Sequence, residues 1–442
     1  MPRQPPRRLP VVALVTALAA LGSRDVPVAS SGYLDAARGA AVWLRTAAIR
    51  SGAGVVWPAD PTDRASVNTS LYAGTPGVVL FFLEMAEATG DGRYLQDARA
   101  GADSLVAGLA DAEGTGLWEG SAGIAFVLQE TAKATGDRRY ADAARRAVRE
   151  IVARAKVAGA GVEWSPTTDI ISGSAGTGLF LMYAARECQD PSLLALAVKA
   201  GDRLVELGRP EGGGLKWAMD PEFPRLMPNF SHGTAGIAYF LATLYGETHA
   251  RRFLEAASAG ARYLQSVAAT AGDVCLIFHD EPDGKDLYYL GWCHGPVGTA
   301  RLFHRLGEVT GDLAWREWTR RAARALRASG IPEKRTPGFW NNVGQCCGSA
   351  GVIEFFLALA RVDQDPSDLA FAERVADDLV RRATREGDGL KWIQAEHRVR
   401  PDLLVAQTGY MQGASGIGAS LLHLWLAEQG RRPPVRLVDS PF

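Results

Sequence analysis

Three cysteines occur at equivalent places in a repeated unit of this 442-residue chain. Cys293 lies in the stretch Gly-Trp-Cys-His-Gly, and the adjacent pair Cys346 and Cys347 lies in the stretch Gln-Cys-Cys-Gly. Both stretches lead through a turn of small residues into a long apolar segment. Three protein ligands with one open position is the arrangement that zinc needs for chemistry, because the open position admits a substrate atom. The sequence therefore predicts a zinc enzyme.

The other two cysteines, Cys188 and Cys275, have no matching context. An odd number of cysteines with one adjacent pair is not typical of a disulfide framework. The charges nearly cancel at a net of −1, and no basic stripe is present. Nucleic acid and anionic membranes are therefore poor candidates as partners.

Residues 1–30 differ in composition from the rest of the chain. Arg3, Arg7 and Arg8 precede an apolar run over 11–21, which is too short to span a bilayer. This pattern is typical of a secretory signal, and Arg7-Arg8 also permits a twin-arginine signal. The alternative is a disordered or helical extension of a cytoplasmic protein. Beyond this segment, the sequence predicts no transmembrane helix.

A Gly-x-x-Gly turn followed by an apolar segment recurs seven times, at intervals of 46, 53, 60, 62, 53 and 65 residues. The turns lie at 74–77, 120–123, 173–176, 233–236, 295–298, 348–351 and 413–416. Each interval is long enough for two helices and their loops. Repeats of this size predict a solenoid or a closed ring.

The segments after the turns are apolar on most faces, which is typical of buried helices. Amphipathic segments with charged outer faces lie between them, for example at 140–156, 312–329 and 369–384. The tripeptide Thr-Gly-Asp marks corresponding turns at 89–91, 135–137 and 310–312. We therefore predict an all-α fold: a seven-fold α/α toroid, with a double ring of inner and outer helices and the glycine turns at one mouth.

The motif Ser231-His232-Gly233 in the fourth repeat completes a pattern with Gly-Trp-Cys-His-Gly in the fifth and Cys-Cys-Gly in the sixth. On these motifs, residues 31–430 resemble the lanthionine synthetase C-like proteins, with 431–442 as a C-terminal tail. The resemblance implies an α/α toroid with a catalytic zinc ion, Zn²⁺, at its mouth. Members of this family add cysteine thiols to dehydroalanine or dehydrobutyrine and so form the thioether rings of lantibiotic-type peptides. Eukaryotic relatives are linked instead to glutathione.

The resemblance also implies the metal ligands. Cys293 matches the zinc ligand of the fifth repeat and Cys346 that of the sixth. Most of the family has histidine after the sixth-repeat cysteine, where this chain has Cys347, and some synthetases carry the same Cys-Cys-Gly. Cys347 is therefore expected to be the third ligand. The alternative is a pair of buried thiols or a vicinal disulfide.

Two further residues match positions to which the family's proton transfer is attributed. His232 matches the fourth-repeat histidine, and a pKa in the neutral range suits that task. Asp169 matches the third-repeat acid that assists proton transfer. Its carboxylate could also simply cap a helix.

Trp292 and His294 flank Cys293 and are candidate substrate contacts. Trp292 could instead be an ordinary core aromatic. His294 could contact substrate, orient a ligand or act as a fourth ligand. Tyr288 and Tyr289 stand where cyclases of the family commonly have an arginine.

The predicted reaction is zinc-dependent addition of a cysteine thiol to a dehydroamino acid in a dehydrated precursor peptide. His232 would protonate the resulting enolate. The toroid takes up the whole chain, so a separate dehydratase would supply the dehydroamino acid. Alternatives are the addition of glutathione or another small thiol, a carbohydrate-active toroid, which needs two acids across the cavity, and a non-catalytic zinc protein.

Overall fold

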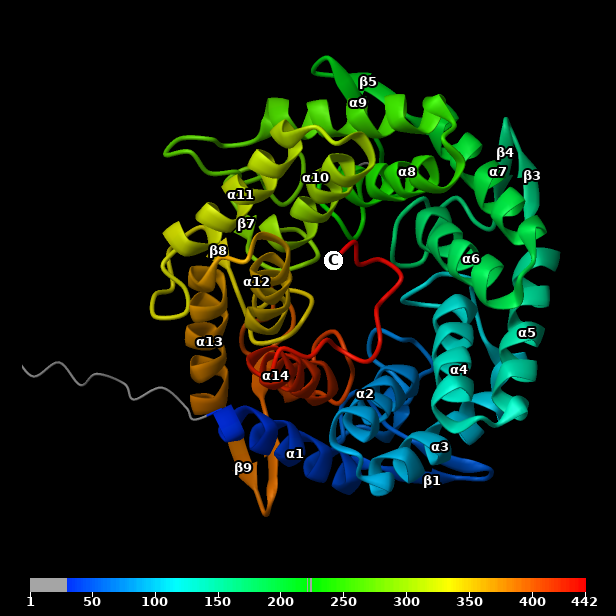
Figure 1. Cartoon of the computed structure of the whole chain (residues 1–442), viewed down its shortest axis with the longest axis vertical. Helices are drawn as coiled ribbons and strands as arrows, with labels where there is room; N and C mark the ends of the chain where they lie inside the picture. The colour runs from blue at the N-terminus through cyan, green and yellow to red at the C-terminus, as the bar shows by residue number, and fades with distance from the viewer. Residues whose placement is uncertain (1–29, 221, 223–224) are drawn as a thin grey trace, which may run out of the picture.

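The computed structural model describes residues 30–220, 222 and 225–442. The predicted signal or extension at 1–30 therefore lies, apart from its last residue, outside the described residues. Within them, the chain forms fourteen α-helices arranged as two concentric rings (Figure 1). This architecture confirms the predicted all-α toroid. No helix in the described part of the chain is both long enough and apolar enough to cross a membrane.

The inner ring consists of the seven helices that begin at the residue after the first glycine of each turn. They are α2 (Thr75–Thr89), α4 (Ser121–Thr135), α6 (Ser174–Cys188), α8 (Thr234–Thr248), α10 (Pro296–Thr310), α12 (Ser349–Asp363) and α14 (Ala414–Glu428). These helices are apolar on most faces, as in α8, where the side chains from Thr234 to Ala242 are all buried. Such helices are stable only when neighbours cover them on every side, and this requirement places them inside.

The outer ring consists of the amphipathic helices. They are α1 (Ser30–Ala47), α3 (Gly92–Ala107), α5 (Arg138–Ala153), α7 (Pro191–Leu207), α9 (Arg251–Val267), α11 (Leu313–Ala328) and α13 (Pro366–Arg381). The expected range 369–384 for α13 was three residues too late at both ends. Asp365 caps this helix through the N–H of Ser367, and Pro366 fits its first position.

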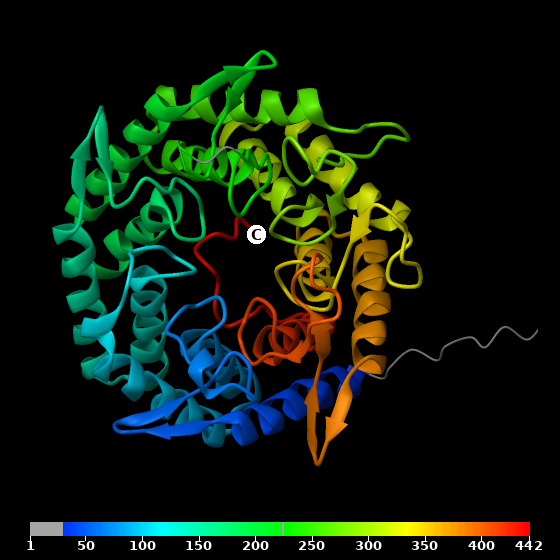
Figure 2. The same ribbon diagram turned by 180° about the vertical axis from the view of Figure 1, so that it is seen from behind.

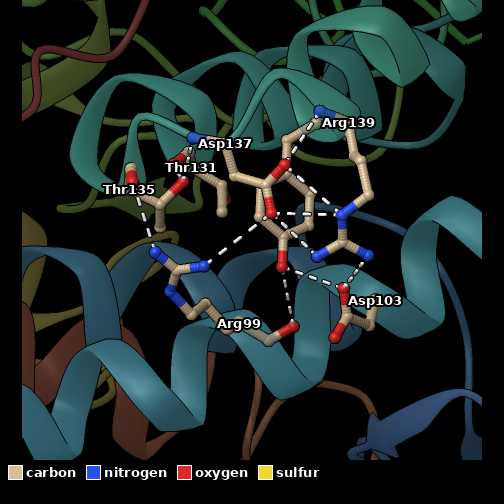
Figure 3. A network of polar contacts seen from close by, with 7 residues as sticks. Arg99, Asp103, Thr131, Thr135, Asp137 and Arg139 are labelled. Atoms are coloured by element: carbon tan, nitrogen blue, oxygen red, sulfur yellow. Dashed lines mark hydrogen bonds and ion pairs between the residues drawn. The ribbon is translucent and has the colours of Figure 1, made fainter.

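Each Thr-Gly-Asp turn ends an inner helix and begins an outer one. In the second repeat, Gly136 adopts a left-handed conformation with φ 67°, and the Asp137 carboxylate accepts the backbone N–H of Arg139. Arg99 of α3 donates to the carbonyl oxygen of Thr135 at 3.2 Å and lies 3.8 Å from Asp137 (Figure 3). The turn therefore reverses the chain and also joins neighbouring outer helices.

Short β-hairpins follow four of the outer helices and were not predicted. The antiparallel pairs are β1 (Ile49–Ser51) with β2 (Gly54–Val56), β3 (Lys156–Ala158) with β4 (Gly161–Glu163), β5 (Arg209–Glu211) with β6 (Gly214–Lys216), and β9 (Thr384–Glu386) with β10 (Gly389–Lys391). A Cβ on Gly161 would lie 1.9 Å from the carbonyl oxygen of Lys199, so glycine allows the hairpin to approach α7.

A buried tryptophan directly after each hairpin satisfies a carbonyl at the end of the preceding outer helix. The indole N–H groups donate at 2.6–2.8 Å, from Trp57 to Leu44, Trp164 to Ile151, Trp217 to Leu204 and Trp392 to Leu379. The last carbonyls of a helix have no partner within the helix, so these side chains act as caps. The repeated sequence is Gly-x-x-Trp.

The remaining strands and short helices lie in the connections. β7 (Tyr288–Tyr289) pairs in parallel with β8 (Phe339–Trp340), and β11 (Ile393–Ala395) pairs with β12 (Leu404–Ala406). Two 3₁₀ turns lie at η1 (Arg64–Ser66) and η2 (Leu109–Asp111).

The two ends of the helical chain close the ring. The first outer helix, α1, packs against the last inner helix, α14 (Figure 1). The seventh helical pair is therefore built from segments far apart in sequence, and the wall has no free edge.

Backbone hydrogen bonds form a second closure at the mouth. We call "the collar" the residues two positions before the first glycine of each turn: Tyr72, Trp118, Ile171, Ser231, Cys293, Cys346 and Met411. Each repeat donates an N–H to a collar carbonyl oxygen of the next repeat at 2.9–3.2 Å, and Met411 donates to Tyr72 to complete the circle. In the third repeat the donor is Ile170 instead of Ile171.

Residues 431–442 turn back into the middle of the ring, and both face views show them there in red (Figures 1 and 2). We call this segment the strap. It begins three residues after the end of α14 and crosses the bore that the inner helices surround.

Candidate metal centre

The three predicted zinc ligands come together at the collar: Cys293 and Cys346 are collar residues, and Cys347 directly follows Cys346. The sulfur of Cys347 lies 3.2 Å from that of Cys293 and 3.4 Å from that of Cys346. All three side chains are buried, and all three thiols are free. The vicinal disulfide considered as an alternative is therefore not formed. Gly291 makes this approach possible, because a Cβ there would lie 2.4 Å from the carbonyl oxygen of Cys346.

The donor set fits a zinc ion. A tetrahedral site with Zn–S bonds of about 2.3 Å separates its sulfurs by roughly 3.8 Å. The three sulfurs lie within 4.8 Å of one another, so small side-chain adjustments would seat the ion. Among the described residues, the cluster contains these three sulfurs and no histidine or carboxylate. His294 is not part of it, and a bound ion would keep one position for an exogenous ligand.

Gln412 and Tyr72 surround the sulfurs and were not predicted. The Gln412 amide nitrogen lies 3.5 Å from the Cys347 sulfur and donates to the Tyr72 hydroxyl at 3.0 Å. Asn342 donates to the Gln412 carbonyl oxygen at 3.1 Å and so fixes the amide. Burial, together with the nearby thiol groups, raises the pKa of Tyr72, which stays a neutral phenol.

His232 and Asp169 form a hydrogen-bonded pair at the same mouth. His232 Nδ1 lies 2.6 Å from one Asp169 oxygen, and the other oxygen accepts the backbone N–H groups of Ser172 and Gly173 at 2.8 and 2.9 Å. Asp169 therefore both caps the turn before α6 and orients the imidazole. Burial opposes protonation of His232, but the hydrogen bond and charge of Asp169 outweigh it, and the pKa of His232 is raised.

His294 lies between His232 and a second histidine that sequence reasoning missed. Its ring centre is 5.8 Å from that of His232 and 4.3 Å from that of His279. His279 Nδ1 is held by Asp280 at 2.7 Å. Burial, with a smaller contribution from the two neighbouring histidines, holds the pKa of His294 well below its usual range. Its ring is therefore neutral.

Trp292 lies in the interior of the ring instead of on the surface of the mouth. Its indole is 2% exposed and packs edge-on against Trp118 and Phe230, at 5.4 and 5.5 Å between ring centres. This is the environment of a core aromatic, the alternative considered for it. The indole N–H donates to Asp439 of the strap at 3.1 Å.

A single register in the repeats explains which side chains reach the mouth. The residues directly before the first glycines are Ala73, Glu119, Ser172, His232, His294, Cys347 and Gln412. With the collar residues one position earlier, they include all three sulfurs, His232, Tyr72 and Gln412. The same register would have identified Gln412 and Tyr72 from the sequence. His279 lies in the long loop between α9 and β7, where no repeat marks it.

Comparison with known proteins gives the following similarities. Among the curated proteins, none matches this sequence. Among solved structures, nisin cyclase is similar, with a TM-score of 0.62 and 16% identity over 91% of this chain and 93% of that chain. At this identity the likeness shows a shared fold.

Two carbohydrate-active enzymes are more distant. The α-1,6-mannanase GH76A from Salegentibacter sp. HEL1_6 has a TM-score of 0.46 and 13% identity over 90% of this chain and 99% of that chain. An unsaturated glucuronyl hydrolase specific for heparin has a TM-score of 0.48 and 11% identity over 92% and 100%. With TM-scores below 0.5, neither enzyme indicates a function for this chain.

The family model of lanthionine synthetase C-like proteins matches residues 65–433. This range includes all seven glycine turns, the three clustered cysteines and the His232–Asp169 pair. The chain therefore belongs to the lanthionine synthetase C-like family.

Proposed function

We propose that this protein catalyses the zinc-dependent addition of a cysteine thiol to a dehydroamino acid of a modified peptide, forming a thioether. The observation that carries the proposal is the cluster of three buried thiols at the same mouth as the His232–Asp169 pair. Membership of the lanthionine synthetase C-like family supports the same chemistry. A separate dehydratase would supply the dehydrated peptide.

The metal would be held by Cys293, Cys346 and Cys347. When bound, zinc supplies a positive charge that lowers the pKa of a substrate thiol, so that a thiolate is available near neutral pH. Gln412 directs an amide N–H toward the Cys347 sulfur and so stabilises negative charge there.

The carbon–sulfur bond forms when the thiolate lone pair attacks the β-carbon of the dehydroamino acid. The π electrons of the double bond move toward the carbonyl oxygen and give an enolate, and the thiol proton leaves to solvent. His232 then donates a proton to the α-carbon. Asp169 holds Nδ1, so Nε2 is the nitrogen left to face the substrate. The His232 side chain is 31% exposed and can recover its proton from water.

Other toroid chemistries fit these residues less well. Glycoside hydrolysis needs two carboxyl groups that face each other across the substrate. Asp169 is committed to His232 and to two backbone N–H groups, and a carbohydrate enzyme would leave the three thiols without a role. A purely structural zinc site would use four protein ligands, whereas three are grouped here among the described residues.

The test uses zinc-loaded protein and a synthetic peptide that contains one dehydroalanine and one cysteine. Cyclisation leaves the peptide mass unchanged, so the free thiol is trapped with an alkylating reagent and counted by mass spectrometry. We expect the wild type to protect the thiol, and the matched variant His232→Gln to protect it far more slowly at unchanged zinc content. A second arm offers glutathione to a cysteine-free dehydroalanine peptide, and adduct formation there alone would identify a small thiol as the substrate. No reaction in either arm with stoichiometric zinc would refute the proposed function.

A further inference from the structure

The strap places a fully buried carboxylate next to the metal centre. Asp439 has no exposed surface, although it lies only a few residues from the end of the described chain. A buried carboxylate is strongly disfavoured unless charged and hydrogen-bonding partners compensate it. The partners of Asp439 therefore reveal what the strap is bound to.

Two side chains from the fifth repeat provide part of that compensation, and burial still raises the pKa of Asp439. Trp292 donates its indole N–H to one Asp439 oxygen at 3.1 Å, and Arg301 lies 3.2 Å from the same oxygen. Arg301 also donates to the Asp439 backbone carbonyl at 2.8 Å. Arg301 belongs to α10, which begins directly after the Cys293 turn, so both contacts fix the strap to the segment that carries this ligand.

Trp292, which donates to Asp439, is joined by one peptide bond to the candidate ligand Cys293. Cys293 is the next residue, and its main chain is held on both sides: its N–H donates to Cys346, and its carbonyl oxygen accepts from Phe230 and Ser231. The Trp292 ring beside the ligand packs against Trp118 and Phe230, which are apolar contacts. Asp439 adds the hydrogen bond that fixes the indole N–H.

The strap does not simply fill the bore. A cavity of about 400 Å³ lies against it and is lined by strap residues that include Arg436, Ser440 and Phe442. Phe442 packs on His304 at 4.5 Å between ring centres, away from Trp292. Because space remains beside the strap, its position depends on specific contacts such as those of Asp439 more than on close packing.

We propose that Asp439 is a positioning residue for the metal centre. Its carboxylate locks Trp292 and Arg301 and thereby holds the Cys293 sulfur in register with those of Cys346 and Cys347. The inference rests on the proposed zinc site and assigns the strap a role in metal affinity.

The test measures zinc affinity by competition with a chromophoric chelator, on the full chain, for Asp439→Ala, Asp439→Asn and Trp292→Phe. Residues that support metal ligands change affinity by about 10–100-fold, and we expect Asp439→Ala at the lower end of that range. Trp292→Phe removes the other half of the contact and should weaken binding similarly, and the double variant should be no weaker than either single one. The cobalt-substituted Asp439→Ala protein should show an altered thiolate-to-cobalt absorption band.

Phe442→Ala is the matched control, because it loosens the strap without touching Trp292. We expect it to lower the melting temperature while zinc affinity is retained. Equal loss of affinity in Phe442→Ala and Asp439→Ala would overturn the inference, as would unchanged affinity in both Asp439 variants. If the wild type itself binds no zinc, the proposed function fails; if it binds zinc and Asp439→Ala binds equally well, only this inference fails.

Discussion

The backbone N–H of Cys293 donates to the carbonyl oxygen of Cys346 at 3.0 Å, so the repeats that supply the sulfurs are joined at the residues that carry them. The sulfur positions are therefore set by a main-chain contact that belongs to the collar as a whole. Every pair of neighbouring repeats makes a backbone hydrogen bond of this kind. Between the fifth and sixth repeats, the same bond also brings the cysteine ligands together.

Removing one clustered thiol should abolish tight zinc binding. We expect Cys347→Ala to lose more affinity than the 10–100-fold that changes around metal ligands cost, because a ligand itself is lost. The measurement is zinc content after dialysis against a weak chelator. Cys188→Ala and Cys275→Ala remove the other two cysteines and should retain stoichiometric zinc; equal retention by Cys347→Ala would argue against a three-thiol site.

Asp169→Asn should shift the pH dependence of the reaction. The pKa of His232 is raised by Asp169 against the opposing effect of burial, which extends the protonated, proton-donating form to higher pH. Without the carboxylate charge the pKa falls, so the decline in kcat/KM with rising pH should begin at lower pH. Glu119→Gln is a graded control, because Glu119 contacts Ser172 and not the imidazole, and its shift should be smaller. An unmoved profile in Asp169→Asn would exclude His232 as the titrating acid.

Gln412→Met should weaken zinc binding without unfolding the ring. The substitution keeps the side-chain volume but removes the donor to the Cys347 sulfur, and we expect a loss of about tenfold in affinity. Gln345 provides the matched control, since its amide donates to Gly416 and Ser420 and not to a sulfur. Gln345→Met should lower stability and keep zinc affinity. If Gln412→Met kept its zinc affinity while Gln345→Met lost it, the contact between Gln412 and the Cys347 sulfur would have no role in zinc binding.

His423 should make stability depend on pH. It lies between Glu354 at 2.8 Å and Glu84 at 3.3 Å. Burial opposes its charge, but these two carboxylates prevail and raise its pKa to about 10. A raised folded-state pKa contributes stability at low pH that is lost as pH rises from the usual histidine value toward 10. The difference in unfolding free energy between wild type and His423→Gln should therefore shrink over that range in urea titrations. If the unfolding free energies of the wild type and His423→Gln changed in parallel with pH, the ion pairs of His423 with Glu354 and Glu84 would be contradicted.

The hydrogen bond from a capping tryptophan should contribute measurably to the free energy of unfolding. Trp217→Phe keeps the aromatic packing but leaves the Leu204 carbonyl unpaired, and an unsatisfied buried acceptor costs about 1–3 kcal/mol. Urea unfolding gives the free-energy difference. Trp425→Phe is the comparison, because the half-buried Trp425 contacts Arg431 through its ring face, and it should cost less.

The ring could be predicted because glycine turns and apolar periodicity are local features. Each Gly-x-x-Gly begins an inner helix, and the seven repeats gave the seven-fold fold directly. The hairpins were not predicted from their Gly-x-x-Trp motif. The role of this motif is visible only in the structure, where the indole N–H donates to a helix carbonyl 13 residues earlier, as Trp217 does to Leu204.

The candidate site was predictable to the extent that it follows the repeat register. Cys293, Cys346, Cys347 and His232 could be named as candidates because their motifs lie at the turns, and Gln412 shares that register. The contact between Trp292 and Asp439 spans 147 residues. The strap lies outside the repeats, so no repeated motif indicates which residue of the ring it contacts. The contact of Trp292 with Asp439 therefore could not be predicted from the residues next to Trp292 in sequence.

The ring has a seam where α1 meets α14 and where Met411 bonds to Tyr72. Residues 431–442 follow every helix of the wall in sequence, and the backbone bond between Met411 and Tyr72 that closes the ring does not involve them. The wall and its centre are thus separable, because the surroundings of Trp292 are completed by Asp439 of the strap and not by the wall alone. Proteolytic removal of residues 431–442 should therefore leave the ring closed and uncover Trp292.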